Sequence, residues 1–190
     1  MSTPFEELQS RANKRWNELA AGESAWIRVG GGTSGQAAGA DAVFDAFKST
    51  VGATGVNANL SKVSARGLMY LEPLVDILLP NGARVYYGNV KPEEAQAIVE
   101  QHVTNGKPLI DRAFAYSGGD GSSTGNLPLL ESMPMVALQQ RIATRNFGDT
   151  DPHDLLQYVA NGGYTALNRA ITEMTPEQIV DEVKAAGLRG

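Results

Sequence analysis

The sequence predicts an α/β protein: a mixed four-stranded β-sheet with flanking helices, followed by a mostly helical C-terminal extension. Three observations lead to this prediction. A strand, a helix and a second strand follow one another between residues 25 and 63. An asparagine–glycine hairpin comes next, and the C-terminal part carries helix caps with little strand pattern. The length of 190 residues suits one domain with an appendage.

The chain begins with the pattern of a capped helix. Thr3 stands at the N-cap position, Pro4 follows at the first helical position, and Glu6 completes a capping box. We expect the helix to end near Gly22. Apolar residues recur at helical spacing along it: Phe5, Leu8, Ala12, Trp16 and Leu19.

A parallel β–α–β unit is expected next. Residues 25–29 form a short apolar run that is typical of a buried strand, and residues 56–63 alternate as a second strand does. The helix between them spans residues 37–51. A right-handed crossover through this helix would make the two strands parallel. The helix is expected to bury Ala40, Val43, Phe44 and Phe47.

A hairpin and a further helix complete the predicted sheet. The apolar runs 74–79 and 83–88 flank Pro80-Asn81-Gly82, a sequence that favours a tight turn. Residues 91–94 open a helix with acidic residues at its positive end, and Gly106 ends it. The resulting order of elements is that of a thioredoxin-like fold.

The chain divides into three predicted parts. Residues 1–116 form the thioredoxin-like domain, residues 117–133 a linker, and residues 134–190 the C-terminal part. The linker begins with a glycine- and serine-rich stretch, SGGDGSSTGN, that has little to bury.

The C-terminal part is predicted to be mostly helical. Residues 136–144 have the pattern of a strand. A helix then begins at Asp151-Pro152 and ends at Gly162-Gly163, and a second spans residues 164–174. A third helix opens at the capping box of residues 175–178 and ends at Gly187.

Composition excludes several classes of function. The net charge is −5 and no basic run is present, which argues against a nucleic-acid partner. The chain has no cysteine, so disulfides, thiol chemistry and cysteine-ligated zinc or iron–sulfur clusters are excluded. No apolar stretch is long enough to span a membrane, and the N-terminus lacks the pattern of a signal peptide. We therefore expect a cytoplasmic protein.

A glycine-rich loop is the one nucleotide-like motif. Gly30, Gly32 and Gly35 form G-x-G-x-x-G between a predicted strand and a predicted helix, which is the position of a dinucleotide-binding loop. That fingerprint also requires an acidic residue near the end of the second strand, and none is present around Val63. A tight structural loop is favoured. A small-ligand or nucleotide-binding module using Gly30–Gly35 is the alternative.

The remaining polar motifs carry no complete site. His102 and His153 are the only histidines, and we expect both to be ordinary surface residues. Asp149 and Asp151 lack the further ligands of a calcium loop.

Residues 29–40 together with 63–73 resemble the thioredoxin-like [2Fe–2S] ferredoxin domain of respiratory complex I and its relatives. In that family a C-x4-C and a C-x3-C motif hold the cluster from two loops. In this sequence the four cysteine positions fall on Gly30, Gly35, Ala65 and Met69, while framework residues persist around them. The resemblance therefore implies a cluster-binding domain that has lost its metal ligands.

Residues 140–190 resemble the beginning of the flavin- and NADH-binding subunit of complex I, NAD-reducing hydrogenases and NAD-dependent formate dehydrogenases. The resemblance implies that Gly187, Arg189 and Gly190 lie at the edge of an incomplete flavin site. FMN, NAD and iron–sulfur clusters are expected only in an intact parent complex, with none held by this chain. The matching segments are Gln140–Gly148, Asp151-Pro152, Gly162–Leu167, Met174–Glu177 and Gly187–Gly190.

These resemblances imply a non-catalytic structural and docking region of an NADH dehydrogenase-like subunit. The expected partners are other subunits of a redox complex, among them a ferredoxin-like [2Fe–2S] subunit. No activity is expected from this chain alone, and the parent enzyme would be an NADH:acceptor oxidoreductase. The chain is either an N-terminal piece of such a subunit or a short stand-alone relative.

Overall fold

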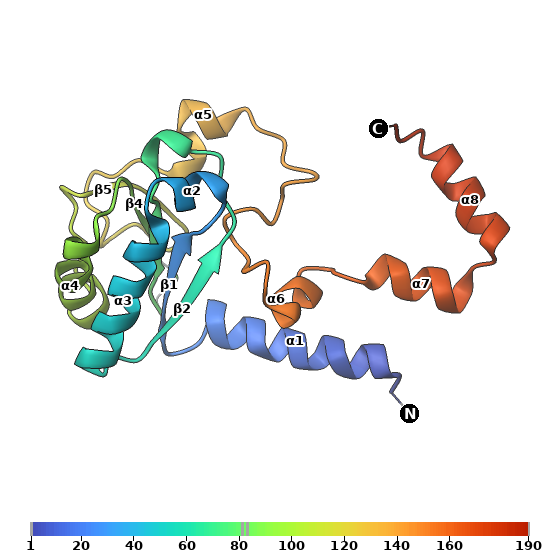
Figure 1. Ribbon diagram of the computed structural model, residues 1–190, viewed down its shortest axis with the longest axis horizontal. Helices are drawn as coiled ribbons and strands as arrows, with labels where there is room; N and C mark the ends of the chain where they lie inside the picture. The colour runs from blue at the N-terminus through green and yellow to red at the C-terminus, as the bar shows by residue number, and fades with distance from the viewer. Residues whose placement is uncertain (1, 81, 83, 190) are drawn as a thin grey trace.

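The computed structural model describes residues 2–80, 82 and 84–189. Its centre is a five-stranded sheet with the strand order β2-β1-β3-β4-β5 (Figure 1). The β1–β2 pair is parallel, and the other pairs are antiparallel. The strands are β1 (Ala25–Gly30), β2 (Ala58–Val63), β3 (Val75–Leu78), β4 (Arg84–Tyr87) and β5 (Ala113–Ser117).

Helices flank the sheet and make up most of the C-terminal part. The α-helices are α1 (Pro4–Ala20), α2 (Thr33–Ala37), α3 (Ala40–Thr54), α4 (Ala95–Ile98), α5 (Pro134–Ala137), α6 (Leu155–Ala160), α7 (Thr165–Glu173) and α8 (Pro176–Ala185). A π-helical segment, η3 (Val99–Thr104), continues α4, and short 3-10 turns are η1 (Met69–Leu71), η2 (Pro92–Glu94) and η4 (Leu130–Ser132). No helix in these described residues is long and apolar enough to cross a membrane.

The mixed sheet, its flanking helices and the helical C-terminal part confirm the predicted fold class. The capping boxes at Thr3 and Thr175 are both present, and each opens the predicted helix. The hairpin joins β3 to β4, although Asn81 and Ala83 of its turn lie outside the described residues. The sheet gains a fifth strand, β5, which pairs with β4 and was not among the four predicted strands.

The strand predicted at residues 136–144 is wrong. Residues 134–137 form α5 instead, and the residues that follow lie in turns. Leu138 and Ile142, which would have been the apolar face of a strand, are 92% and 83% exposed. An apolar alternation without a neighbouring strand edge to pair with does not make a strand.

The two faces of the sheet are covered differently. On one face, Ile27 and Val29 of β1 pack in a large apolar cluster with Phe47 of α3 and Ile98 of α4. On the other face, Trp26 of β1 packs against Trp16 of α1, with ring centroids 5.6 Å apart. Because side chains alternate along a strand, Arg28 lies on this second face too. We call this second face, which carries Arg28, the polar face of the sheet.

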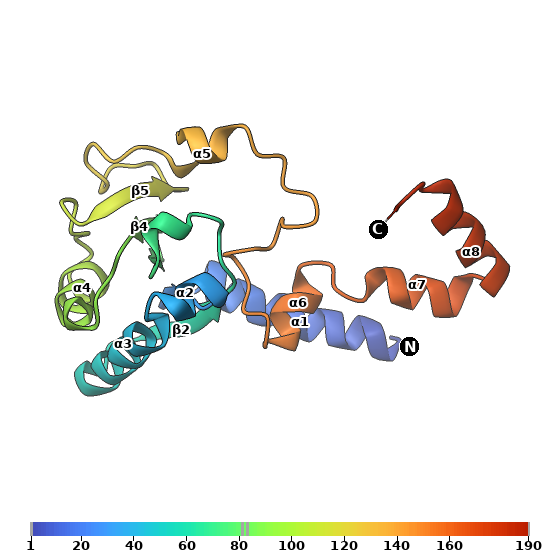
Figure 2. The ribbon, with the colours of Figure 1, turned by 45° about the horizontal axis from the view of Figure 1, so that its top comes forward.

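The chain beyond β5 first returns to the sheet and then leaves it. The Tyr116 N–H donates to the Pro128 carbonyl at 3.0 Å, and Thr124 in the glycine-rich stretch is buried. Farther on, α6 lies beside α1, while α7 and α8 extend away from the sheet (Figures 1 and 2). The domain boundaries at residues 116, 133 and 134 stay predictions.

Candidate functional site

The loops after β1 and β2 meet at one edge of the sheet. Since the two strands are parallel, their carboxyl ends lie together, and Gly30 is the register partner of Val63. The Gly31 N–H donates to the Val63 carbonyl at 2.7 Å and ties the first loop to the second. A Cβ atom on Gly32 would lie 2.9 Å from the Ala65 nitrogen. The fold thus brings the predicted positions of the two loops together.

Close packing rather than a ligand fills the space between these loops. A Cβ atom on Gly35 would lie 2.1 Å from the Gly30 carbonyl oxygen, a distance that forces the backbone apart. The same Cβ would be 3.2 Å from Glu72 Oε2, and a Cβ on Gly30 would be 3.0 Å from that oxygen. Only glycine therefore fits at residue 35, while a side chain at residue 30 would require the Glu72 carboxyl group to move.

Glu72 places a carboxyl group between Gly30 and Gly35. Its side chain is buried, and Oε2 accepts a hydrogen bond from the Leu74 N–H at 3.0 Å. Burial raises the pKa of Glu72 above its ordinary value, because a charged carboxylate is poorly solvated there. The carboxyl group thus acts as an internal spacer between the loop backbones.

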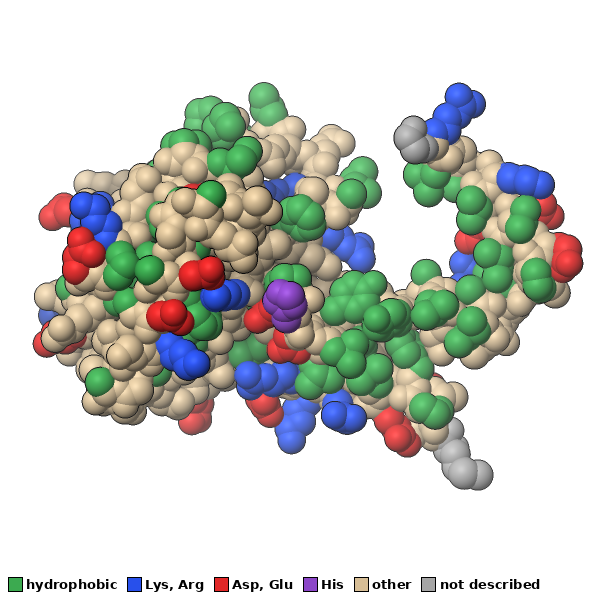
Figure 3. All heavy atoms as spheres, viewed as in Figure 1, with side chains coloured by type: hydrophobic (Ala, Val, Ile, Leu, Met, Phe, Trp, Pro, Cys, Tyr) green, Lys and Arg blue, Asp and Glu red, His purple; other side chains and the backbone are tan. Residues whose placement is uncertain are grey.

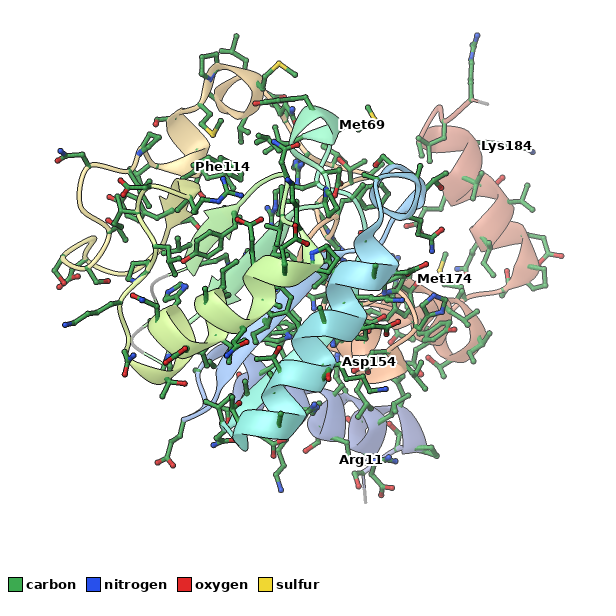
Figure 4. All side chains as sticks on the ribbon, turned by 60° about the vertical axis from the view of Figure 1, so that its left-hand side comes forward. Arg11, Met69, Phe114, Asp154, Met174 and Lys184 are labelled. Atoms are coloured by element: carbon green, nitrogen blue, oxygen red, sulfur yellow. The ribbon has the colours of Figure 1, made fainter. Side chains whose placement is uncertain are left out.

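An iron–sulfur cluster does not fit the residues of these loops. Iron in such clusters is held by thiolates, and the four positions carry Gly30, Gly35, Ala65 and Met69. Met69 lies in η1 at the surface of the molecule (Figure 4), and it is 67% exposed. Among residues 2–80, 82 and 84–189, no group of three or more His, Asp or Glu side chains is placed to hold a metal ion.

Two N–H groups at the start of the glycine-rich loop are engaged in backbone hydrogen bonds. The Gly30 N–H donates to the Leu74 carbonyl at 2.8 Å, and the Gly31 N–H is used by Val63. A phosphate-binding loop needs such N–H groups free to point at its ligand. The helix that follows, α2, has only five residues. These bonds leave Gly30 and Gly31 without a free N–H group for a phosphate.

A buried cluster of charges on the polar face of the sheet was missed by sequence reasoning. Arg28 on β1 is completely buried, and its Nε donates to Asp76 Oδ1 of the register partner on β3 at 2.7 Å. Arg84 on β4 and Arg66 in the loop after β2 complete the cationic side. The sequence does hold a hint, since Arg28 and Asp76 are opposite charges inside two otherwise apolar strands.

Asp149 joins this cluster from the C-terminal part. Its Oδ1 accepts hydrogen bonds from Arg84 Nη1 at 2.6 Å and from Arg66 Nη2 at 2.7 Å. Arg28 Nη1 lies 3.7 Å from the same oxygen. One carboxylate therefore links residues from three separate segments of the sheet domain.

The pKa values in the cluster follow from burial and from these pairs. Burial lowers the pKa of Arg28, although Asp76 opposes this effect. Burial acts against the charge of Asp149 as well, but the three neighbouring guanidinium groups outweigh it and lower its pKa. Asp76 and Asp149 raise the pKa of Arg84 in spite of its burial. The cluster contains three arginine and two aspartate side chains, so it has one more basic than acidic group.

His102 is buried, contrary to the expectation of a surface residue. It lies in η3, where its Nδ1 is 2.9 Å from the Tyr87 hydroxyl oxygen. That hydroxyl oxygen also accepts a hydrogen bond from the Leu109 N–H at 3.2 Å. Burial lowers the pKa of His102 to about 4. His153 is exposed, as expected.

The C-terminal helices present apolar surface instead of a site. A groove of about 720 Å³ lies between α1 and α7, and hydrophobic side chains gather there (Figure 3). Phe5, Leu8, Leu167 and Ile171 line it. Beyond α8, Gly187 has a positive φ of 64° and Arg189 is exposed, while Gly190 lies outside the described residues.

Curated redox proteins match part of the chain in sequence, and two of them are described here. One is the NADP-reducing hydrogenase subunit HndC of Solidesulfovibrio fructosivorans, which is 52% identical over 52 residues. The other is an NADH-quinone oxidoreductase subunit of Rhizobium meliloti (strain 1021), which is 47% identical over 49 residues. Part of this chain is homologous to these redox subunits. The matches cover 27% and 26% of the chain but only 10% and 12% of the relatives, so this chain spans about a tenth of their length.

Solved structures of a thioredoxin-like [2Fe–2S] ferredoxin from Aquifex aeolicus also match. A structure at 1.5 Å resolution is 24% identical with a TM-score of 0.41, covering 48% of this chain and 96% of the ferredoxin. A second is 25% identical with a TM-score of 0.43, covering 51% of this chain and 94% of the ferredoxin. No protein-family model matches the sequence. The fold described above rests on the strand order and register of this chain itself.

Proposed function

We propose that this chain is a non-catalytic structural and docking region of an NADH dehydrogenase-like oxidoreductase subunit. Its homology to HndC and to the NADH-quinone oxidoreductase subunit supports the redox family. The observation that carries the non-catalytic role is the closed space between the two loops, where Glu72 and the Gly30 carbonyl stand against Gly35. Electrons in the parent enzyme would bypass this domain.

In this proposal, the cofactors of the parent enzyme are not bound by this chain. FMN, NAD and iron–sulfur clusters would be held by other parts of the complex. Gly187, Arg189 and Gly190 would contribute at most the edge of a flavin site, by resemblance. A bound flavin would accept hydride from NADH, and no residue described here takes part in that step.

The docking surface in this proposal is the exposed apolar side of α7 and α8. Ile171 is 73% exposed, and Leu167 and Val183 are more than half exposed. Arg169 of α7 and Glu182 of α8 form an exposed ion pair between the two helices at 3.1 Å. Contiguous exposed apolar side chains on adjacent helices are typical of protein interfaces. The proposed partner is a ferredoxin-like [2Fe–2S] subunit of the same enzyme.

Association with that partner tests the proposal. The full chain and the purified [2Fe–2S] subunit should co-elute in size-exclusion chromatography, and Ile171→Glu combined with Val183→Glu should abolish co-elution. The matched control is Ala42→Glu combined with Ser49→Glu, two exposed positions on α3 that add the same two negative charges outside α7 and α8. If the wild-type chain does not associate, or if the double variant associates equally well, the docking role is wrong.

The alternative, a small-ligand or nucleotide-binding module at Gly30–Gly35, makes a different prediction. A ligand held at 100 times its Kd would add about 2.7 kcal/mol to the free energy of unfolding. NADH or FMN should then shift the amide resonances of residues 31–35. The engaged N–H groups of Gly30 and Gly31 lead us to expect no such shift.

A further inference from the structure

A small recess on the C-terminal side of the charge cluster is lined by three arginines. It has a volume of about 180 Å³ and lies between η4, α5 and the turns that follow α5. This volume is several times the roughly 30 Å³ that one water molecule occupies in the liquid. The lining residues are Arg66, Leu130, Glu131, Val136, Arg141, Arg145 and Asp149.

Arg141 is held in place by neutral acceptors. Its Nη1 donates to the Phe147 carbonyl at 3.1 Å, its Nη2 donates to the Arg66 carbonyl, and its Nε donates to the Gln139 amide oxygen at 3.3 Å. These bonds fix the orientation of the guanidinium group and leave its charge without a counterion. Burial lowers the pKa of Arg141, and the charge of Arg66 lowers it further.

The nearby acidic groups do not neutralise the recess. Asp149 is already shared by Arg28, Arg66 and Arg84. In the described part of the chain, neither Arg141 nor Arg145 has a carboxylate within 4.0 Å.

Arg66 has a hydrogen-bond donor that is not used. Its side chain is only 10% exposed, yet its Nε has no hydrogen-bond partner among the described residues. This Nε packs close to Gly148, while Nη2 is bonded to the Gly148 carbonyl and to Asp149. A buried guanidinium that is only partly bonded is costly, and an added acceptor in the recess would offset that cost.

We infer that this recess binds a phosphate group, either free or carried on a small organic molecule. Arg141 uses three of its five N–H groups on neutral acceptors, so two remain, and Arg145 adds a planar fork of N–H donors, the arrangement that matches the oxygens of phosphate. Leu130 and Val136 form an apolar wall that strengthens such charged hydrogen bonds by excluding water. Glu131, on the same lining, opposes the anion and limits its affinity. This inference does not depend on the docking role or on Gly30–Gly35.

Isothermal titration of the full chain with inorganic phosphate, at fixed ionic strength in chloride, tests the inference. Binding should be saturable, with one phosphate per chain. Arg141→Gln and Arg145→Gln should each weaken it at least tenfold, and Glu131→Gln should tighten it. The matched control, Arg15→Gln on α1, should leave it unchanged, because Arg15 does not line the recess and pairs with Glu18.

Titrations with AMP and with adenosine separate the two sources of phosphate. AMP binding tighter than both inorganic phosphate and adenosine would assign the recess to an organic phosphate, and tighter inorganic phosphate would assign it to the free ion. Circular dichroism of each variant verifies that it is folded. Absence of saturable phosphate binding, or equal binding by wild type and the two arginine variants, would overturn the inference.

Discussion

Arg84 of β4 donates through Nη1 to Oδ1 of Asp149, 65 residues farther along the chain, at 2.6 Å. This bond joins the polar face of the sheet to the segment between α5 and α6. Arg66 donates to the same oxygen from a different loop. The C-terminal part is therefore attached to the sheet through a carboxylate surrounded by guanidinium groups.

Replacing Asp149 with Asn should detach this segment from the sheet. Breaking a fully buried ion pair costs roughly 3–5 kcal/mol, and we expect about 2 kcal/mol here because the Asp149 side chain is 30% exposed. The free energy of unfolding in urea measures the effect. Asp45→Asn, an exposed position on α3, is the control and should change it by less than about 0.5 kcal/mol. Equal effects of the two substitutions would show that Asp149 is not an anchor.

Gly35→Ala and Gly52→Ala should have opposite effects on stability. The added methyl at residue 35 meets the Gly30 carbonyl oxygen at 2.1 Å, so we expect destabilisation by at least about 2 kcal/mol. Gly52 lies inside α3 with open space around it, and alanine there should stabilise by up to about 1 kcal/mol. Thermal unfolding of both variants gives the two signs. A neutral Gly35→Ala would contradict the closed packing of the loops.

Local patterns in the sequence were enough to predict most of the elements. The capping boxes at Thr3 and Thr175 depend on residues close in sequence, and the structure has both where the patterns place them. The loop predicted at Gly30–Gly35 is shorter, because β1 extends to Gly30 and α2 begins at Thr33. The apolar alternation at residues 136–144 resembled a strand for the same local reason. It failed because strand formation also requires a partner edge, and this segment lies outside the sheet.

The candidate sites depend on contacts between residues that are far apart in the sequence, so local patterns do not predict them. Asp149 appeared only as half of an incomplete calcium pattern, because its three arginine partners lie 65 to 121 residues away. His102 looked like a surface residue because the tyrosine that accompanies it, Tyr87, belongs to β4. Glu72 gave no pattern at all, since its role follows from the backbones of Gly30 and Gly35.

His102 should make the folded state sensitive to mild acid. Its pKa is about 4 in the folded protein and 6.5 as an ordinary value, so below pH 6.5 the unfolded chain takes up a proton that the folded chain refuses. The contribution is complete above pH 6.5 and is lost as the pH falls to about 4, amounting to about 3 kcal/mol. Urea unfolding at a series of pH values measures this loss.

The two histidines provide an internal comparison for this pH dependence. His102→Gln should reduce the loss of stability between pH 6.5 and 4, because the buried imidazole that refuses the proton is gone. His153→Gln should retain the wild-type dependence, since His153 is exposed. A wild-type profile that is flat over this interval would contradict the assignment to His102.

Whether the loops after β1 and β2 can hold iron is the most direct question for the proposed non-catalytic role. The purified full chain is treated anaerobically with ferrous iron, sulfide and a thiol reductant, alongside a thioredoxin-like [2Fe–2S] ferredoxin, and both are desalted. We expect the ferredoxin to become coloured and this chain to retain neither iron nor acid-labile sulfide, because its loops carry no thiolate donors. Iron and sulfide in stoichiometric amounts, with a visible absorption band that survives desalting, would contradict the account.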